Sequence, residues 1–239
     1  MSRIHPAVGN DLGGNWRASD PTPVTTNAVY SALAPPAIRQ VDHTPREPRS
    51  GEPIVITAKV TDPEGVLSVK LLCQPVGPGS FIPAEFPLTH SQLLATPTLA
   101  RTANPAFENP TNWTEVAMTD DGSGSDAIAG DGVFTGTMPG QSNRTLVRYR
   151  IVATDANTPG SSVRVPHADD PSLNFACFVY DGVPPYVPTD RTVRVEGLGH
   201  AYSSAVMTSL PVYLLVTRGA DLAECIADET HLQNPKTNT

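Results

Sequence analysis

The residues best suited to bind a ligand or take part in a reaction lie in one acidic stretch, TDDGSGSDAIAGDGVF at 119–134. Carboxylates supply hard oxygen ligands, and glycines let backbone carbonyls turn inward, which together suit calcium. The candidate metal ligands are Asp120, Asp121, Asp126 and Asp131. The spacing is not that of an EF-hand, which needs a D-x-D-x-D-G run and a glutamate at its twelfth position.

The same stretch also has a purely structural interpretation. Its two Asp-Gly pairs, at 121–122 and 131–132, favour tight turns, because aspartate caps such turns and glycine adopts positive φ. The sequence therefore leaves two alternatives: a loop that binds calcium, or a strand connection that requires no ion. No other cofactor is expected.

No catalytic constellation is predicted elsewhere. The histidines, at 5, 43, 90, 167, 200 and 231, show neither i, i+4 nor H-x-E spacing. No G-x-S-x-G nucleophile motif occurs. The glycines at 130 and 132 precede a strand, whereas a phosphate-binding loop precedes a helix, and the acid between them would repel a phosphate group. We expect a chain that is not an enzyme.

Aromatic side chains offer a different chemistry, since exposed rings can stack on sugars. The candidates for such a platform are Trp16, Trp113, Tyr180 and Tyr186. Packing in a core or between domains is the more common fate of such residues. Both alternatives stay open at this point.

Alternating apolar residues predict the elements that position these groups. Strands are expected at 54–61, 67–73, 115–118, 133–138, 146–154 and 173–180, with a short helix near HSQLLA. In the 146–154 strand Val147, Tyr149, Ile151 and Ala153 should point inward, and Arg148 and Arg150 outward. Strands without long helices between them indicate an all-β antiparallel sandwich, here of about seven strands.

Composition narrows the partners. The chain has 239 residues, 25 prolines and a formal net charge of −8. Acidic charge argues against a nucleic-acid partner, which needs clustered Lys and Arg. No apolar run of about 20 residues predicts a membrane span. The first residues lack the apolar centre of a secretory signal, so the chain is either cytoplasmic or a piece of a longer protein.

Four short motifs, taken in order, resemble the immunoglobulin-like or fibronectin-III-like modules of large secreted bacterial proteins. They are VTDPEGVLSVKL, GDGVFTGTMPG, VRYRIVATDA and FVYDGVPPY. The resemblance covers residues 37–182 and implies an immunoglobulin-like sandwich with an insertion at about 77–112. In the modules it resembles, the acidic segment is a connection between strands, and Tyr149 lies where they often place an inward tyrosine.

The flanking segments carry two further resemblances. GNDLGGNWRASDPTPVTTNAVY looks like the closing stretch of a lamin-tail-like domain, within an irregular tail at 1–36. SLPVYLLVTRGADLAECI looks like the start of a spore-coat-H (CotH) type kinase domain, so 183–239 would be a linker and a small α/β remnant. Here a strand is expected at 212–217, with Leu222, Cys225 and Ile226 on one helical face. A kinase needs many more groups than roughly 50 residues can hold.

These resemblances imply an extracellular or cell-surface location and a non-catalytic spacer or interaction module linked to a CotH-type kinase domain. Its partners would be neighbouring domains of the same parent chain. One alternative is a module that binds carbohydrate or another cell-surface polymer, with or without calcium. Another is a fragment of a CotH-like kinase that is inactive without its missing C-terminal part.

Three cysteines give one more structural prediction. In the usual sandwich order one strand separates the strands of Cys73 and Cys177. Two strand spacings are about 9.6 Å, which is beyond disulfide reach. We therefore expect no bridge between Cys73 and Cys177.

Overall fold

The computed structural model describes residues 2–4, 16–18, 20–27, 29–30, 33–158, 160–168, 170–187 and 201–213. The chain divides into two compact units, one made of 1–77 and 82–180, the other of 78–81 and 181–239. Within the described ranges, no helix combines the length and apolar character that crossing a membrane requires.

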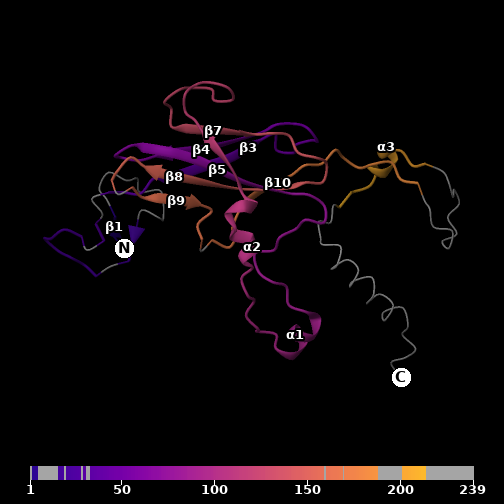
Figure 1. Ribbon diagram of the computed structural model, residues 1–239, viewed down its shortest axis with the longest axis horizontal. Coiled ribbons are helices and arrows are strands. Elements are labelled where there is room, and N and C mark those ends of the chain that lie inside the picture. Colours follow the sequence, from indigo (N-terminus) through magenta and orange to yellow (C-terminus); the bar gives the residue numbers. More distant parts are fainter. Residues whose placement is uncertain are drawn as a thin grey trace. The chain divides into compact units, whose positions relative to one another are not determined.

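The larger unit contains an all-β sandwich of two antiparallel sheets, which confirms the predicted fold class (Figure 1). One sheet has the order β3-β4-β7, formed by β3 (Ala37–Thr44), β4 (Ile54–Thr61) and β7 (Val133–Met138). The other has the order β10-β8-β5-β6, with β9 also paired to β8. Its strands are β5 (Val66–Val76), β6 (Thr114–Met118), β8 (Leu146–Asp155), β9 (Ser162–Val165) and β10 (Phe175–Phe178).

The remaining elements are short. Two-residue strands β1 (Ser2–Arg3) and β2 (Trp16–Arg17) pair with each other. Between β5 and β6 lie α1 (His90–Ala95), α2 (Pro105–Glu108) and the 3-10 turn η2 (Pro110–Asn112). The helix predicted near HSQLLA is therefore confirmed as α1. A capping box formed by Thr89 and Gln92 starts it.

The core forms where the alternating apolar faces of the two sheets meet. Ile54, Ile56, Ala58 and Val60 of β4 are all at most 2% exposed. The four residues predicted to point inward from β8 are also buried, Tyr149 among them. A period of two places every second residue on one face, so these strands could be predicted from the sequence alone.

Strand β5 departs from its predicted pattern at both ends. The predicted strand begins at Leu67, but a bulge between Val66 and Ser68 leaves this residue 68% exposed. The strand also continues through Pro75 to Val76, where the alternation was expected to collapse. β6 pairs with β5 only from Val69 to Cys73, so Pro75 lies beyond the stretch where a second ladder would need its missing N–H.

The chain enters and leaves the sandwich at opposite ends. Ala37, the first residue of β3, pairs with Thr61, close to the turn that leads into Val66 of β5. Phe178, the last residue of β10, pairs with Leu146 at the far end of the same sandwich. The full length of β8 separates the two positions, because Val66 pairs with Asp155 and Val76 with Leu146.

The smaller unit is described only in part. Tyr186 and Tyr202 form an antiparallel bridge with N···O distances of 3.0 and 2.8 Å, and α3 (Ser204–Met207) follows. Val212 and Tyr213 have no regular secondary structure. The rest of the predicted 212–217 strand, and the predicted helix with Leu222, Cys225 and Ile226, lie outside the described residues.

The two described cysteines are free thiols, as predicted. β8 lies between β5 and β10, so one strand separates Cys73 from Cys177. Burial raises the pKa of the Cys73 thiol to about 12 and that of Cys177 to about 11. Both thiols therefore stay protonated, and so unreactive, at neutral pH.

This state predicts slow thiol chemistry in the folded protein. In a Cys225→Ser variant at pH 8, a thiol-reactive dye should label neither remaining cysteine until denaturant unfolds the sandwich, and then label both. The measurement is mass spectrometry before and after unfolding, with and without reductant. Fast labelling of the native protein would contradict the burial of the two thiols. A number of labelled thiols that depends on reductant would contradict the strand order.

Candidate functional site

The acidic stretch forms the connection that carries the chain from one sheet to the other. It leaves β6 at Met118 and enters β7 at Val133. Thr119 and Thr135 pair across its base, and the Gly132 carbonyl accepts a hydrogen bond from Val60 N at 2.9 Å. The loop therefore sits at the end of the sandwich where β4 ends.

Each of the four candidate aspartates accepts hydrogen bonds from the loop's own backbone. The Asp120 carboxylate accepts from Asp131 N at 3.2 Å and Gly132 N at 2.8 Å. The buried Asp126 accepts from Gly122 N at 2.7 Å. Asp121 accepts from Ser123 N and Oγ at 2.9 and 2.7 Å, and Asp131 accepts from Val133 N at 2.8 Å.

These contacts show what holds the loop together. The Ser123 hydrogen bonds keep the pKa of Asp121 below its usual range, so it stays a carboxylate acceptor. The Lys59 ammonium donates to the Asp131 carbonyl, which places a positive charge beside the loop. Among the described residues, no group of three or more His, Cys, Asp or Glu is placed to hold a metal ion. The geometry supports a self-supporting loop, and calcium binding here stays a prediction.

A second polar cluster lies on the outer face of β8 and was not foreseen. Arg148 and Arg150 were expected to point outward. They do lie on the outer face, but they are only 7% and 2% exposed. Residues from the insertion, Phe107 and Trp113, cover them. The predicted direction is confirmed, but the burial was not foreseen because the cover comes from about 40 residues away in the chain.

Arg150 is the centre of this cluster. Its guanidinium carbon lies 4.1 Å from the centroid of the Trp113 ring and 5.3 Å from that of Phe107. Its two terminal nitrogens form a bidentate pair with Glu108 at 2.7 and 2.9 Å. Its Nε donates to Leu173 O and Asn174 Oδ1. A planar fork stacked on aromatic rings and paired with one carboxylate is a geometry that lysine cannot reproduce.

Arg148 occupies the neighbouring position on the same face. It donates to Gln74 Oε1 at 3.0 Å and to Ile82 O at 2.7 Å, and it lies over the Phe107 ring. Burial, with a smaller contribution from Arg150, lowers the pKa of Arg148 from its usual value. Its hydrogen bond to Ile82 ties the insertion to the sheet.

Glu108 is the carboxylate that balances part of this positive charge. The hydrogen bond from Arg150 lowers the pKa of Glu108, and Arg164 adds a weaker contact at 3.6 Å. In Figure 1, α2 accordingly lies against the sheet, while α1 lies away from it at the tip of the insertion. The cluster fastens the insertion to the sandwich. An arginine pair alternating with apolar residues was the signal in the sequence, but nothing there identified its partners.

The aromatic residues do not form one exposed platform within the described chain. The half-buried Trp113 is stacked under Arg150, and its Nε1 donates to Phe107 O at 2.9 Å. Tyr180 is half-buried beside Phe178, with ring centroids 6.1 Å apart. Trp16 is half-buried, whereas Tyr186 is 52% exposed. Packing is thus the role of Trp113 and Tyr180.

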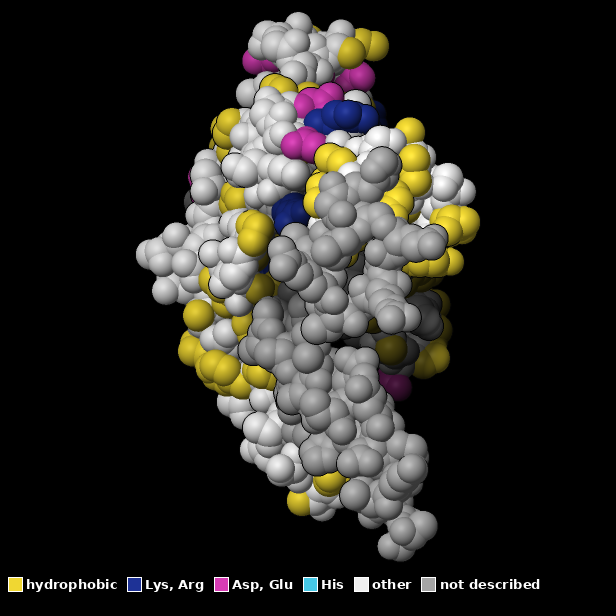
Figure 2. Space-filling model, turned by 90° about the vertical axis from the view of Figure 1, so that its right-hand side faces the viewer, with side chains coloured by type: hydrophobic (Ala, Val, Ile, Leu, Met, Phe, Trp, Pro, Cys, Tyr) yellow, Lys and Arg dark blue, Asp and Glu magenta, His cyan; other side chains and the backbone are white. Residues whose placement is uncertain are grey.

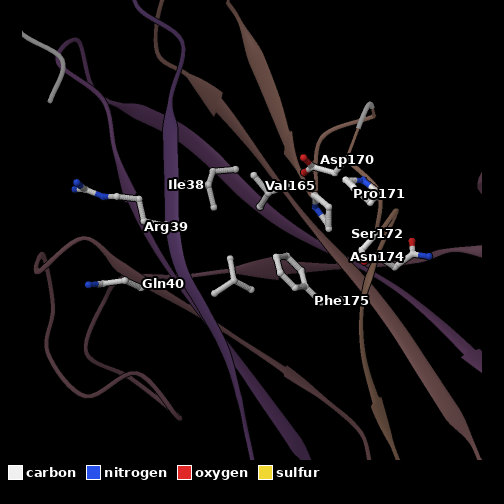
Figure 3. A pocket seen from close by; sticks show the side chains of 11 residues that line it. Ile38, Arg39, Gln40, Val165, Asp170, Pro171, Ser172, Asn174 and Phe175 are labelled. Carbon is white, nitrogen blue, oxygen red and sulfur yellow. The ribbon is translucent and has the colours of Figure 1, made fainter. Parts of the chain in front are cut away.

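A pocket of about 620 Å³ opens between β3 and the segment from β9 to β10 (Figure 3). Ile38, Val165 and Phe175 point into it, whereas Arg39 and Gln40 extend away from it. Two of its polar side chains are engaged elsewhere: Asp170 accepts from His167 N at 2.7 Å, and Asn174 accepts from Arg150. Ligand sites need a few convergent polar groups, so this lining indicates a gap between sheet edges.

The described side chains on the face in Figure 2 form no broad basic area. Among the described side chains on the face in Figure 2, Lys and Arg (dark blue) occupy small areas, one of them beside Asp and Glu (magenta). Hydrophobic side chains (yellow) lie in several separate groups on this face. Such a surface lacks the continuous positive charge that a phosphate backbone requires.

Comparisons with protein-family models, with curated proteins and with solved structures found no match for this chain. The likenesses to immunoglobulin-like, lamin-tail-like and CotH-type domains therefore stay predictions from the sequence motifs.

The arginine cluster gives a direct prediction about stability. Arg150→Lys keeps the charge but loses the bidentate pair and the stacking on Trp113, so it should lower the free energy of unfolding by about 2 kcal/mol. Urea unfolding followed by tryptophan fluorescence measures this change. The matched control is Arg164→Lys, which alters only a long contact to Glu108 and should cost at most about 0.5 kcal/mol. Equal effects of the two variants would show that the stacked fork is not what holds the insertion.

Proposed function

We propose that this chain is a non-catalytic spacer or interaction module of a secreted or cell-surface multidomain bacterial protein. The observation that carries the proposal is the strand register, which puts entry at Ala37 and exit at Phe178 at opposite ends of the sandwich. A module with this geometry separates its neighbours by its own length. The eight residues of β4 alone correspond to roughly 26 Å.

The exit from the sandwich is held by backbone hydrogen bonds. Val179 N donates to Thr145 O at 2.9 Å, and Arg144 N donates to Val179 O at 2.7 Å. Tyr180 N then donates to Pro48 O at 3.0 Å. A proline-rich stretch that includes Pro184 and Pro185 follows, and such stretches act as semi-rigid spacers. Fixed exits of this kind support a role in holding domains apart.

The polar side chains that could have formed a binding or catalytic site also support a structural role. The aspartates of the acidic loop accept hydrogen bonds from their own backbone, and Arg148 and Arg150 fasten the insertion. The packing of Trp113 and Tyr180 favours the spacer over a sugar-binding platform. The proposed link to a CotH-type kinase domain, and to a lamin-tail-like domain before it, rests on the sequence motifs at the two flanks.

The spacer proposal predicts a long and narrow distance across the module. Spin labels at Ala37→Cys and Ser142→Cys, in a Cys225→Ser background, should lie roughly 25–35 Å apart by pulsed electron spin resonance. The buried thiols of Cys73 and Cys177 should not take up label.

The control pair is Glu52→Cys with Ser142→Cys. Both residues lie at the exit end, where Gly51 N donates to Gln141 O at 2.9 Å, so this distance should be clearly shorter. A short distance for the first pair would place entry and exit together. A broad distribution would mean that the module cannot hold its neighbours at a fixed separation. Either result would reject the spacer.

A further inference from the structure

Two carboxylate oxygens lie buried without a hydrogen-bond partner at the entry end of the sandwich. Asp155, the last residue of β8, is 0% exposed. Its Oδ1 accepts from Asn157 N at 3.1 Å and Ser161 N at 3.0 Å. Its Oδ2 is buried and has no partner among the described residues. A buried acceptor in this state is costly unless something binds it.

Asp62 presents the second such oxygen. It opens the turn between β4 and β5, where its Oδ1 accepts from Glu64 N at 2.9 Å. Its Oδ2 is buried and equally without a partner in the described part of the chain. Burial, followed by repulsion from Glu64 and Asp155, raises the pKa of the Asp62 carboxyl.

Backbone contacts place the two segments that carry these carboxylates side by side. Val66 pairs with Asp155 in the β5–β8 register, and Ala156 N donates to Gly65 O at 2.9 Å. The turn that carries Asp62 therefore lies beside the segment that follows Asp155. No ion pair within the described residues joins either carboxylate to a Lys, Arg or His.

The segment that follows Asp155 also supplies a neutral side-chain oxygen. Asn157 belongs to the same segment as Asp155, and its buried amide nitrogen also lacks a partner in the described chain. The two ends of an amide are interchangeable by a half turn of the side chain, and the hydrogen-bond network decides which is favoured. Turning the Asn157 amide replaces an unpaired donor with a third oxygen.

We propose that Asp62, Asp155 and Asn157 form a calcium site that is separate from the acidic loop. These three residues offer two carboxylates and one amide oxygen, and none of them is a His or Cys. Oxygen ligands of this kind suit a hard cation. Calcium tolerates an irregular shell completed by backbone carbonyls and water, whereas magnesium demands near-ideal octahedral geometry. The inference goes beyond the spacer role, which stands or falls independently of it.

The site has a mechanical consequence for the module. It joins the β4–β5 turn to the segment after β8, close to the residue where the chain enters the sandwich. A cation there replaces repulsion between two carboxylates by a bond that links the two segments. Because the site has few charged ligands, we expect it to bind calcium weakly, with a Kd on the order of 10⁻⁴–10⁻³ M, as in extracellular modules.

Thermal melting of the full chain with calcium as the only added ligand tests the proposal. At 10 mM calcium the Tm of the wild-type chain should rise by roughly 3–6 °C. Asp62→Asn keeps the acceptor for Glu64 N but removes a charge, so it should abolish this rise. In calcium-free buffer the same variant should melt above the wild type, because the repulsion is gone.

The control is the double variant Asp121→Asn with Asp131→Asn, which alters the acidic loop but keeps the acceptors for Ser123 and Val133. It should retain the full calcium shift. Loss of the shift in this control would assign calcium to the acidic loop and overturn the proposal. No shift in the wild type, or an undiminished shift in Asp62→Asn, would overturn it as well.

If Asp62→Asn does not fold, direct binding keeps the proposal testable. Equilibrium dialysis with radioactive calcium should find weaker binding in Asn157→Ala than in the wild type, and unchanged binding in the acidic-loop control. Equal binding in the wild type and Asn157→Ala would reject the site.

Discussion

The structure depends on burying both faces of one strand, β8. Along its length it pairs with β5 on one side, and with β10 and then β9 on the other. Its inner face meets the opposite sheet through Val147, Tyr149, Ile151 and Ala153. Its outer face carries two arginines, and a buried guanidinium is tolerated only when its donors are satisfied. Glu108, Leu173 and Asn174 accept hydrogen bonds from Arg150, and Phe107 and Trp113 stack on the guanidinium groups. The insertion is therefore bound to the sheet by the charge that it covers.

Two groups of aspartates lie toward the entry end of the sandwich, and they differ in how their oxygens are hydrogen-bonded. In the acidic loop every candidate aspartate accepts from a nearby backbone N–H, which removes the need for an ion to order the loop. Asp62 and Asp155 differ from these aspartates, because each has one buried carboxylate oxygen that accepts no hydrogen bond from the described residues. The contrast separates aspartates that shape a loop from aspartates positioned to bind something. Both groups lie toward the entry end, so the two ends of the module differ in chemistry as well as in chain direction.

The sequence predicted what depends on local alternation and missed what depends on distant contacts. The strand at 54–61 coincides with β4 because its residues alternate strictly, and the strand at 133–138 coincides with β7. β3 was missed because a bulge between Arg39 and Asp42 interrupts its register, and β9 because it has only four residues. Arg148 and Arg150 were placed on the correct face, but their burial depends on an insertion whose packing no local pattern encodes. The turn that carries Asp62 lies beside the segment after Asp155 because of the β5–β8 register, which only the structure supplies.

The central claim is that β8 is buried on both faces because Arg150 is held between the insertion and the sheet. The most direct measurement is nuclear magnetic resonance of the arginine side chains. We expect a slowly exchanging Arg150 Nε–H, because this nitrogen donates to Leu173 O and Asn174 Oδ1. We also expect nuclear Overhauser contacts from the Arg150 side chain to the Trp113 ring, on which it stacks. A rapidly exchanging Arg150 Nε–H without contacts to Trp113 would show an open outer face and contradict the account.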